Sequence, residues 1–413
     1  MKYSFPKYCQ RNLYNDIQTI LIESTKMIIT GSLIHGIELK NFRMMISKQY
    51  DCDNVFLTGS GRLAIAMALK VVKKNNLING EQYVLLPFYI CPWVVKTVLD
   101  AGFTPLFVSI RKDMTMDYEN LDSLKIQKSV VAIIPHVYGF PAQIYKLIKK
   151  IKKINPEILI VDDAASGYNV LVGGQKLGSF GDFGILSFGQ GKLLNATSGG
   201  ALLLYNNKFL EQLKTEYCGL PEISLRNKVH DLFEVIWHAG LHRYADTLSY
   251  WIAKFIPYEF KPKGYFCRMA NIDASLATIC MKNISYIHEQ RARIISNYYQ
   301  RMNSHKNIFF PQALPDGCPP VSRLYFGLRG TSFILDDDGD IKEHNPMFIF
   351  ARERGVKLFY PYLPPKGFMR EFKVYWRKFP WLYSLLGLPI DFKRSLEWHN
   401  KVVETIMLYV RNS

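Results

Sequence analysis

Two residue types that suit one kind of chemistry occur in the stretch 158–200 of this 413-residue chain. An apolar run ends in the carboxylates Asp162 and Asp163, and Lys192 follows in a loop that closes with Gly199-Gly200. A carboxylate at the end of a buried strand can keep a pyridine nitrogen protonated, and a loop lysine can form a Schiff base with an aldehyde. The pattern is compatible with such chemistry, and the structural alternatives are a helix N-cap for Asp163 and a solvent-facing loop lysine for Lys192.

A second candidate feature is the loop Thr58-Gly59-Ser60-Gly61, which lies between an apolar run at 55–57 and a helical pattern at 62–74. Backbone N–H groups at the start of such a helix suit a phosphate. Residues 59–64 also fit the loose dinucleotide pattern G-x-G-x-x-A, but Glu81 precedes the next strand instead of ending it. By itself the loop is therefore either a phosphate site or a plain strand-to-helix turn.

The elements that would position these residues form a regular series. Strands and helices alternate through residues 55–205, which predicts an α/β domain with a largely parallel sheet. Ligands bind such sheets at the carboxyl ends of the strands. Four residues follow closely on predicted strands and should converge on one edge of the sheet: Gly59, Pro87, His136 and Asp163. This convergence favours the phosphate interpretation of Ser60-Gly61.

The length of the chain allows two domains or one large domain with an appendage. The predicted parts are an N-terminal helical segment (1–50), a large α/β domain with a helical insert near 225–262 (51–265), and a long helix with a small α+β C-terminal domain (266–413). Within the last part we expect one helix over 268–302 and strands near 332–335 and 356–359. Asp336-Asp337-Asp338 predicts a polar turn, since the other ligand positions of a calcium loop are missing.

The charge balance of the chain is strongly basic. Lys and Arg total 52 against 35 for Asp and Glu, a formal net charge of +17, which allows nucleic acid, anionic membranes or phosphorylated small molecules as partners. The lysines within 144–153 favour a solvated outer helix over a nucleic-acid face, because they lie where an amphipathic helix meets water. The insert is either a packed helical pair or an amphipathic membrane contact through residues 229–260.

Cysteine usage and the start of the chain predict a cytoplasmic protein. The seven cysteines are unclustered, which argues for reduced thiols. The first residues lack the apolar core of a signal peptide, and no uncharged apolar run is long enough to span a membrane. No zinc pattern is expected from the histidines of the insert, since their spacing fits none; these are His230, His238 and His242.

Six segments, taken in this order, resemble the DegT/StrS-type sugar aminotransferases, a family of fold type I pyridoxal-phosphate enzymes. They are Ser60 to Arg62, Leu85 to Cys91, His136 to Pro141, Asp162 to Ser166, Gly178 to Asp182, and Ser187 to Gly200. The resemblance covers about residues 50–300, with a weaker echo at Phe359-Tyr360-Pro361. It implies pyridoxal 5'-phosphate as cofactor and a homodimer with active sites between the subunits.

Carried over by position, the resemblance also implies residue roles. Lys192 would hold the cofactor as a Schiff base and later shuttle a proton, and Asp163 would pair with the pyridinium nitrogen. Ser60, Ser187 and the Gly61 backbone would hold the phosphate. The implied substrate is a nucleotide-linked keto sugar of surface polysaccharide or glycoconjugate synthesis, with glutamate as the amino donor. The dehydratase branch of the family has histidine in place of this lysine.

The chain departs from the family pattern at five positions. Ser166 replaces a glutamine that touches the ring hydroxyl, and Arg62 replaces the threonine of the phosphate loop. Phe266 replaces an asparagine that reaches the neighbouring subunit's phosphate, Gln143 replaces an acid, and Cys91 occupies a position that often stacks on the ring. The changes at Ser166, Phe266 and Arg62 motivate a rival hypothesis, a non-catalytic scaffold or regulator. A membrane-peripheral enzyme that uses residues 229–260 to approach a lipid-linked acceptor is another. A nucleic-acid binder fits the net charge alone.

Overall fold

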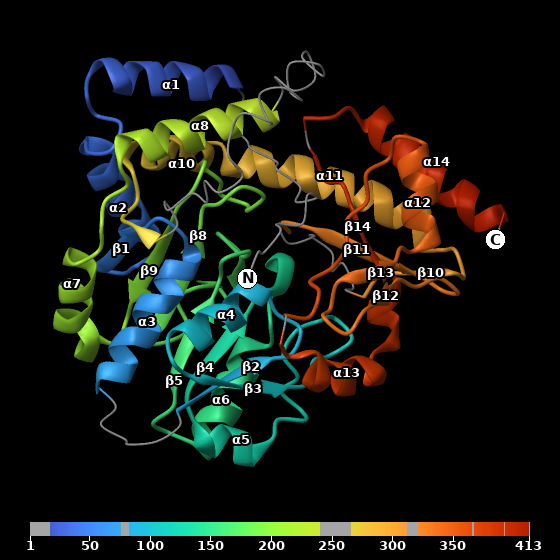
Figure 1. Ribbon diagram of the computed structural model, residues 1–413, viewed down its shortest axis with the longest axis horizontal. Coiled ribbons are helices and arrows are strands. Elements are labelled where there is room, and N and C mark those ends of the chain that lie inside the picture. Colours follow the sequence, from blue (N-terminus) through green and yellow to red (C-terminus); the bar gives the residue numbers. More distant parts are fainter. Residues whose placement is uncertain are drawn as a thin grey trace.

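The computed structural model describes residues 17–75, 82–239, 266–311, 321–365, 367–391 and 393–412. Its largest element is a seven-stranded sheet of order β1-β9-β8-β5-β4-β2-β3 (Figure 1). The strands are β1 (Asn54–Thr58), β2 (Tyr83–Pro87), β3 (Thr104–Val108), β4 (Ser129–Pro135), β5 (Leu159–Asp163), β8 (Phe183–Ser187) and β9 (Gly200–Leu204). Only β9 runs against its neighbours β1 and β8, so the predicted largely parallel sheet is confirmed.

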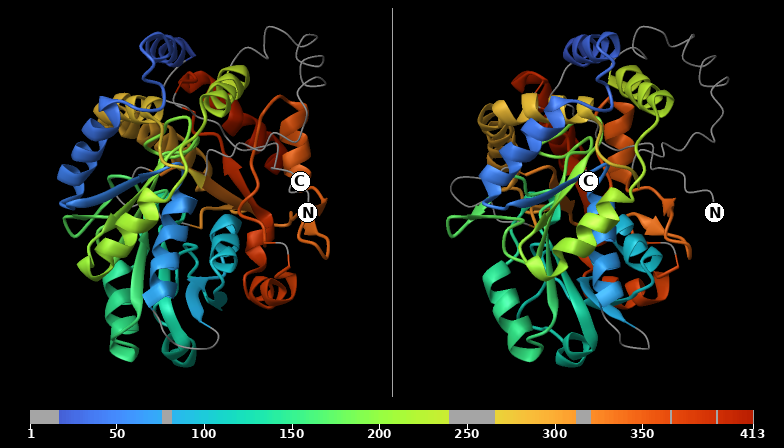
Figure 2. Two further views of the ribbon diagram at one scale, coloured as in Figure 1. Left: turned by 60° about the vertical axis from the view of Figure 1, so that its left-hand side comes forward. Right: turned by 90° about the vertical axis from the view of Figure 1, so that its left-hand side faces the viewer.

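Helices cover both faces of this sheet, as the side views of Figure 2 show. Alternation along β1 sets the two faces, because Phe56 belongs to one buried cluster while Val55 and Leu57 belong to another. The first face carries α3 (Gly61–Asn75), α4 (Pro92–Asp100) and α7 (Leu210–Cys218). The second carries α2 (Ile37–Tyr50) and α10 (Asn271–Lys282) at one end and α5 (Ser123–Lys128) and α6 (Ile144–Ile154) at the other. The result is a three-layer α/β/α arrangement.

The outer helix α6 behaves as its sequence predicts. It buries Ile144, Leu147 and Ile151 against the sheet, and its lysines lie on the half-buried and exposed sides. At the other end of the molecule α1 (Ile17–Ile29) lies beside α8 (Leu225–Ala239), the first part of the helical insert. The remainder of the predicted insert, including His242 and residues 240–260 of the predicted membrane contact, falls outside the described residues, as do Cys9 and Cys318.

The C-terminal part forms its own small layers, drawn in orange and red in Figure 1. Its three-stranded sheet consists of β10 (Ile308–Phe309), β11 (Leu324–Leu328) and β14 (Leu385–Leu388). The helices around it are α11 (Ile284–Met302), α12 (Pro346–Glu353), α13 (Met369–Lys378) and α14 (Leu396–Asn412). Two small hairpins complete the described strands, β6 (Leu171–Val172) with β7 (Gln175–Lys176), and β12 (Ile334–Leu335) with β13 (Ile341–Glu343).

Two local predictions for this part were wrong. The single helix expected over 268–302 is two helices, because the chain leaves helical geometry at Asn283 (φ −106°, ψ 11°), whose side chain donates to the Ile279 carbonyl. The strand expected near 356–359 is reduced to one bridge between Phe359 and Gly387. The tri-aspartate segment is the predicted polar turn, in which Asp336 accepts backbone hydrogen bonds from Asp338 and Asp340.

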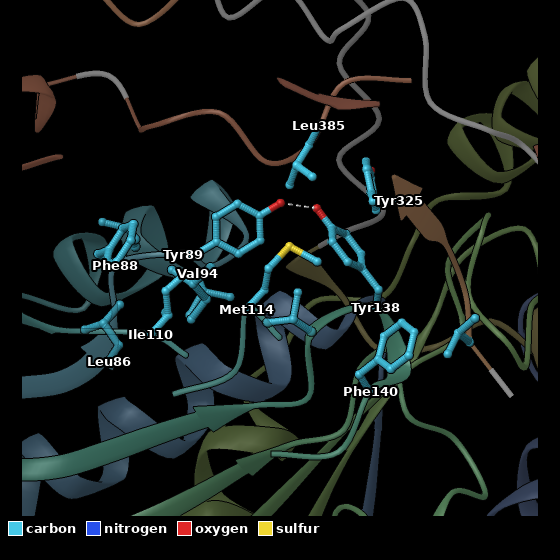
Figure 3. Close-up of a cluster of buried hydrophobic side chains, with 14 of the residues drawn as sticks. Leu86, Phe88, Tyr89, Val94, Ile110, Met114, Tyr138, Phe140, Tyr325 and Leu385 are labelled. Atoms are coloured by element: carbon cyan, nitrogen blue, oxygen red, sulfur yellow. Dashed lines mark hydrogen bonds between the residues drawn. The ribbon is translucent and has the colours of Figure 1, made fainter. Parts of the chain in front are cut away.

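Aromatic side chains join the C-terminal part to the large sheet. Tyr89 and Tyr138 follow β2 and β4, and their hydroxyls share a hydrogen bond of 2.8 Å (Figure 3). The Tyr138 ring lies 4.5 Å from Tyr325 of β11, centroid to centroid. Nearby, Phe88 stacks on Tyr375 of α13 at 4.8 Å. Aromatic pairs of this kind add stability beyond their buried area, so this seam fixes the two parts against each other.

The close approach of Gly184 to the Gly178 carbonyl oxygen generates a first prediction. A Cβ at residue 184 would overlap with that oxygen, and the backbone atom cannot move aside as a flexible side chain would. We expect Gly184→Ala to lower the free energy of unfolding by about 3 kcal/mol. Urea denaturation followed by circular dichroism measures this.

The matched control is Gly219→Ala. Residue 219 has an ordinary φ of −77°, and an added Cβ would meet its nearest atom at 3.5 Å. Its unfolding free energy should stay within about 0.5 kcal/mol of wild type. Equal effects of the two substitutions would contradict the proposed overlap.

Candidate active site

The carboxyl ends of the parallel strands gather the predicted site residues along one edge of the sheet. Gly59 follows β1, His136 follows β4, Asp163 ends β5 and Ser187 ends β8. These four strands and β2, which Pro87 ends, all point in the same direction. The predicted convergence of Gly59, Pro87, His136 and Asp163 is therefore confirmed. Edges of this kind are where open α/β sheets bind ligands.

The Ser60-Gly61 loop and Ser187 lie against each other. Gly61 begins α3, and a Cβ at that residue would lie 3.0 Å from the Ser187 Cβ. The Ser60 hydroxyl accepts the backbone N–H of Leu63 at 3.2 Å, which caps the helix. A helix N-terminus, a glycine and two serines thus lie together, a combination of the type that holds a phosphate.

Asp162, the first of the paired carboxylates, is completely occupied by protein contacts. Its Oδ1 accepts a hydrogen bond from Nε2 of His136 at 2.7 Å. Its Oδ2 accepts the backbone N–H groups of Gly178 at 2.6 Å and Phe180 at 3.0 Å. The Ala142 N–H donates to Nδ1 of His136, so the ring proton is on Nε2 and points at Asp162. Asp162 therefore holds one loop, at residues 178–180, and a histidine in place.

Asp163, the second carboxylate, is buried but less occupied. Its Oδ1 accepts the backbone N–H of Ala165 at 3.1 Å, and within the described part of the chain no residue hydrogen-bonds its Oδ2. Burial raises the pKa of Asp163, while the Ala165 N–H and the charge of Lys192 oppose this shift. A cation that faced the second oxygen would stabilise the carboxylate. No helix follows β5, so the N-cap alternative for Asp163 was wrong.

Lys192 points into the same region rather than into solvent. Its Nζ donates to the Ser166 hydroxyl at 3.0 Å, and Ser166 itself is only 6 % exposed. The loop around the lysine is held by the Lys192 N–H to Gly189 carbonyl bond of 3.1 Å and by Asn195, whose side chain donates to the Lys192 carbonyl. The solvent-facing alternative for this lysine was therefore wrong, and a serine orients its amine.

Cys91 and Arg62 lie beside this group. Burial raises the pKa of the Cys91 thiol, and the charges of Lys192 and Arg62 lower it, which places both cations within electrostatic range of the sulfur. The Arg62 guanidinium lies over the Trp93 ring, 4.4 Å from its centroid. Of the other departures from the family pattern, Gln143 is exposed before α6 and Phe266 is 57 % exposed.

The sequence did not predict the hydrogen-bond partners that distinguish Asp162 from Asp163. His136 was expected at the sheet edge, but no bond to Asp162 was inferred from the sequence. The period of a strand contains the missing signal, because neighbouring residues of β5 must point to opposite faces. Asp162 and Asp163 could therefore never share one role. The loop contacts of Asp162 at residues 178 and 180 depend on tertiary structure alone.

Comparison with known proteins agrees with this geometry. The family model for the DegT/DnrJ/EryC1/StrS aminotransferase family matches residues 16–327. The UDP-N-acetyl-3-dehydro-alpha-D-glucosamine 3-aminotransferase of Acidithiobacillus ferrooxidans is 29% identical over 37% of this chain and 40% of its own length. The spore coat polysaccharide biosynthesis protein SpsC of Bacillus subtilis is 21% identical over 71% of this chain and 69% of its own.

Solved structures share the fold over the whole chain. The PLP form of Spr1654 from Streptococcus pneumoniae superimposes with a TM-score of 0.71 at 18% identity, covering 98% of each chain. The fold is thus that of the fold type I pyridoxal-phosphate enzymes. With the family model matching most of its length, the chain belongs to the DegT/DnrJ/EryC1/StrS aminotransferase family, whose cofactor is pyridoxal 5'-phosphate.

The residues at the sheet edge fit this cofactor. The open Oδ2 of buried Asp163 suits a protonated ring nitrogen, and the group of Ser60, Gly61 and Ser187 suits the phosphate. Lys192 would supply the amine that the cofactor's aldehyde requires. Ser166 is hydrogen-bonded to that amine, a contact that was not predicted for it.

The contrast between the adjacent carboxylates gives a second prediction. Asp162→Asn should lower the free energy of unfolding by about 3 kcal/mol, because an amide cannot accept all three hydrogen bonds. In Asp163 burial raises the folded-state pKa, so the carboxylate is less favourable in the folded chain than in the unfolded chain, and the neutral Asp163→Asn apoprotein should be at least as stable as wild type at pH 7. Urea denaturation of both apoproteins checks the stability difference.

For cofactor affinity we expect the opposite order, with the larger effect in Asp163→Asn. Asp163→Asn should weaken pyridoxal-phosphate binding at least about ten-fold, about 1.4 kcal/mol, because the ring cation loses its counter-charge. The titrated visible absorbance reports this affinity. Loss of stability in Asp163→Asn with unchanged cofactor affinity would show that the roles of the two carboxylates are reversed.

Proposed function

We propose that the protein is a pyridoxal-phosphate-dependent aminotransferase that transfers an amino group, from glutamate, to a nucleotide-linked keto sugar. The observation that carries this proposal is the meeting of Lys192, Ser166 and buried Asp163 at one sheet edge beside the Ser60-Gly61 loop. The five described cysteines are free thiols, which supports a reducing, cytoplasmic setting. Among the described residues, none of the helices is long and apolar enough to cross a membrane.

The proposed mechanism assigns each residue a task. The bound cofactor supplies an electrophilic aldehyde and an electron-withdrawing ring. Asp163 holds a positive charge on the ring nitrogen, which preserves that electron demand. Lys192 would be the point of covalent attachment, and its amine would hold and move the proton in the reaction. Ser166 keeps this amine in position through the 3.0 Å hydrogen bond.

The phosphate side of the site would fix the cofactor's orientation. Ser60, Ser187 and the backbone at Gly61 lie together at the start of α3, where the helix dipole favours an anion. Arg62 lies next to it over Trp93 and supplies a charge where the family has a hydroxyl. An anchored phosphate converts binding energy into alignment of the reacting carbon with Lys192.

The names of the relatives support a sugar acceptor. The matched Acidithiobacillus protein is named for a UDP-linked 3-dehydro-glucosamine and SpsC for spore coat polysaccharide synthesis. The matched segment covers less than half of the first of these, so the substrate class stays part of the proposal. A net charge of +17 is compatible with a diphosphate-containing substrate. We place the reaction in surface polysaccharide or glycoconjugate synthesis.

We further propose a homodimer. Apolar side chains are exposed along α1, where Ile22 is 57 % and Ile29 is 79 % exposed, and along α8, where Leu225 is 58 % exposed. Phe266 is exposed at the position from which the family reaches a neighbouring subunit's phosphate. Two adjacent helices with uncovered apolar side chains are typical of a subunit contact.

The cofactor lysine provides the third prediction. Purified wild-type protein should show a visible absorbance band that borohydride removes, and Lys192→Ala should lack it, because no amine remains for covalent attachment. The rate of transamination from glutamate to keto-sugar nucleotides should fall at least about 10³-fold, about 4 kcal/mol in activation free energy.

Lys149→Ala is the control for this substitution, since Lys149 is exposed on the outer helix α6. It should keep the band and the rate. A wild-type protein without a band after addition of pyridoxal phosphate would overturn the enzyme proposal and leave the scaffold hypothesis. A band without activity on any keto-sugar nucleotide would overturn the substrate class alone.

The dimer proposal gives the fourth prediction. Wild-type protein should have twice the chain mass in light scattering coupled to gel filtration, and Ile29→Glu combined with Leu225→Glu should be monomeric, because two charges would be buried in the contact. Leu124→Glu, at a 68 % exposed site on α5, should remain dimeric. A monomeric wild type, or a dimeric double variant, would contradict this interface.

A further inference from the structure

A buried ionic cluster lies behind the loop of Lys192. The Nζ of Lys228 is 2.6 Å from Oδ2 of Asp273, and the two side chains are 0 % and 2 % exposed. The Ser198 hydroxyl donates to the same carboxylate oxygen at 3.0 Å, and the Ser198 N–H donates to Oδ1 at 3.2 Å. The Thr197 hydroxyl donates to Oδ1 of Asp273 and accepts from Lys228 at 3.0 Å.

The cluster joins three elements that are far apart in the sequence. Thr197 and Ser198 belong to the returning half of the Lys192 loop, directly before Gly199 and β9. Lys228 lies in the first turn of α8, and Asp273 lies in the first turn of α10, where the helix dipole favours its negative charge. The ionic contact therefore connects the loop of the cofactor lysine to both helices.

Burial of two charges has a high desolvation cost, which apolar side chains of the same size would avoid. Here both oxygens of the carboxylate and the lysine amine are hydrogen-bonded to the loop. The bonds constrain both a backbone N–H and two side chains of the loop. A cluster with this geometry contributes directed constraints on residues 197–198, which nondirectional apolar packing cannot supply.

We propose that Lys228 and Asp273 are positioning residues for Lys192. They hold residues 197–198 in place. Two hydrogen bonds within the loop extend this constraint to the lysine. Asn195 Nδ2 donates to the Lys192 carbonyl at 3.1 Å, and the Ala196 N–H donates to the Phe188 carbonyl at 2.7 Å. The Lys192 amine thereby stays aligned with Ser166 and Asp163. This inference rests on the proposed function only in treating Lys192 as the cofactor lysine.

The decisive variant is Lys228→Met combined with Asp273→Leu. The single change Lys228→Met should lower the melting temperature, because it leaves a buried carboxylate without its cation, and the double change should recover it. Hydrogen exchange of the apoprotein, measured by mass spectrometry, should still show the amides of residues 193–199 exchanging at least about ten-fold faster than in wild type. Such recovery of stability without recovery of loop protection is what a positioning role requires.

The matched control removes an exposed ion pair. Arg293→Met with Glu289→Leu deletes the 2.6 Å pair on α11, whose side chains are 67 % and 57 % exposed, and should change neither melting temperature nor loop exchange. If the buried double variant recovers stability and also retains wild-type exchange at residues 193–199, the proposal is overturned.

A second variant decides the case in which the double change fails to recover stability. Thr197→Val with Ser198→Ala keeps the Lys228–Asp273 pair and removes the hydroxyl bonds to the loop. Faster exchange of residues 193–199 would support the proposal, and wild-type exchange would overturn it.

Cofactor titration separates this inference from the proposed function. We expect the dissociation constant for pyridoxal phosphate, read from the visible band, to rise about ten-fold in the variants that loosen the loop, about 1.4 kcal/mol. If the wild type shows no visible cofactor band, the proposed function is wrong. Hydrogen exchange of residues 193–199 then still tests whether the cluster positions the loop. A normal wild-type band with unchanged affinity and exchange in the variants defeats only the positioning role.

Discussion

The insertion of antiparallel β9 between β1 and β8 is the constraint on which the rest of the site depends. Because β9 pairs with both strands, the loop that leaves β8 must return beside the end of β1. Ser187 is thereby brought next to Ser60-Gly61, which lies more than a hundred residues earlier. Gly200 permits this approach, since a Cβ there would lie 2.5 Å from the Ser60 carbonyl carbon. Backbone pairing thus places the proposed phosphate-binding residues at one end of the loop that carries Lys192.

The alternation of side chains along β5 places the two carboxylates at its end in different surroundings. Asp162 and Asp163 are adjacent in the chain but face opposite sides, so they meet different surroundings. Asp162 finds His136 and two backbone N–H groups and acts as a structural anchor. Asp163 finds burial and the charge of Lys192, which leaves one oxygen for a ligand. Identical side chains thus acquire different chemistry from their environments alone.

Rigidity around the site comes from two different interactions. On one side, the aromatic seam of Tyr89, Tyr138 and Tyr325 holds the C-terminal part against the strand ends (Figure 3). On the other side, the buried pair of Lys228 and Asp273 holds residues 197–198 of the loop that carries Lys192. Aromatic packing resists separation but tolerates sliding, whereas hydrogen-bonded charges fix direction. Their combination positions a reactive amine without placing it on a regular element.

The sequence by itself determined the alternating elements, the parallel sheet and the convergence of Gly59, Pro87, His136 and Asp163, because hydrophobic period and glycine-rich turns are local signals. Family resemblance added the cofactor. The sequence pattern did not predict the break at Asn283, where a local hydrogen bond ends a continuous helical pattern. Tertiary structure alone decided what surrounds each of the two carboxylates, that Ser166 contacts the lysine amine, and that Lys228 pairs with Asp273. These depend on contacts between distant segments, which exist only once the sheet has brought those segments together.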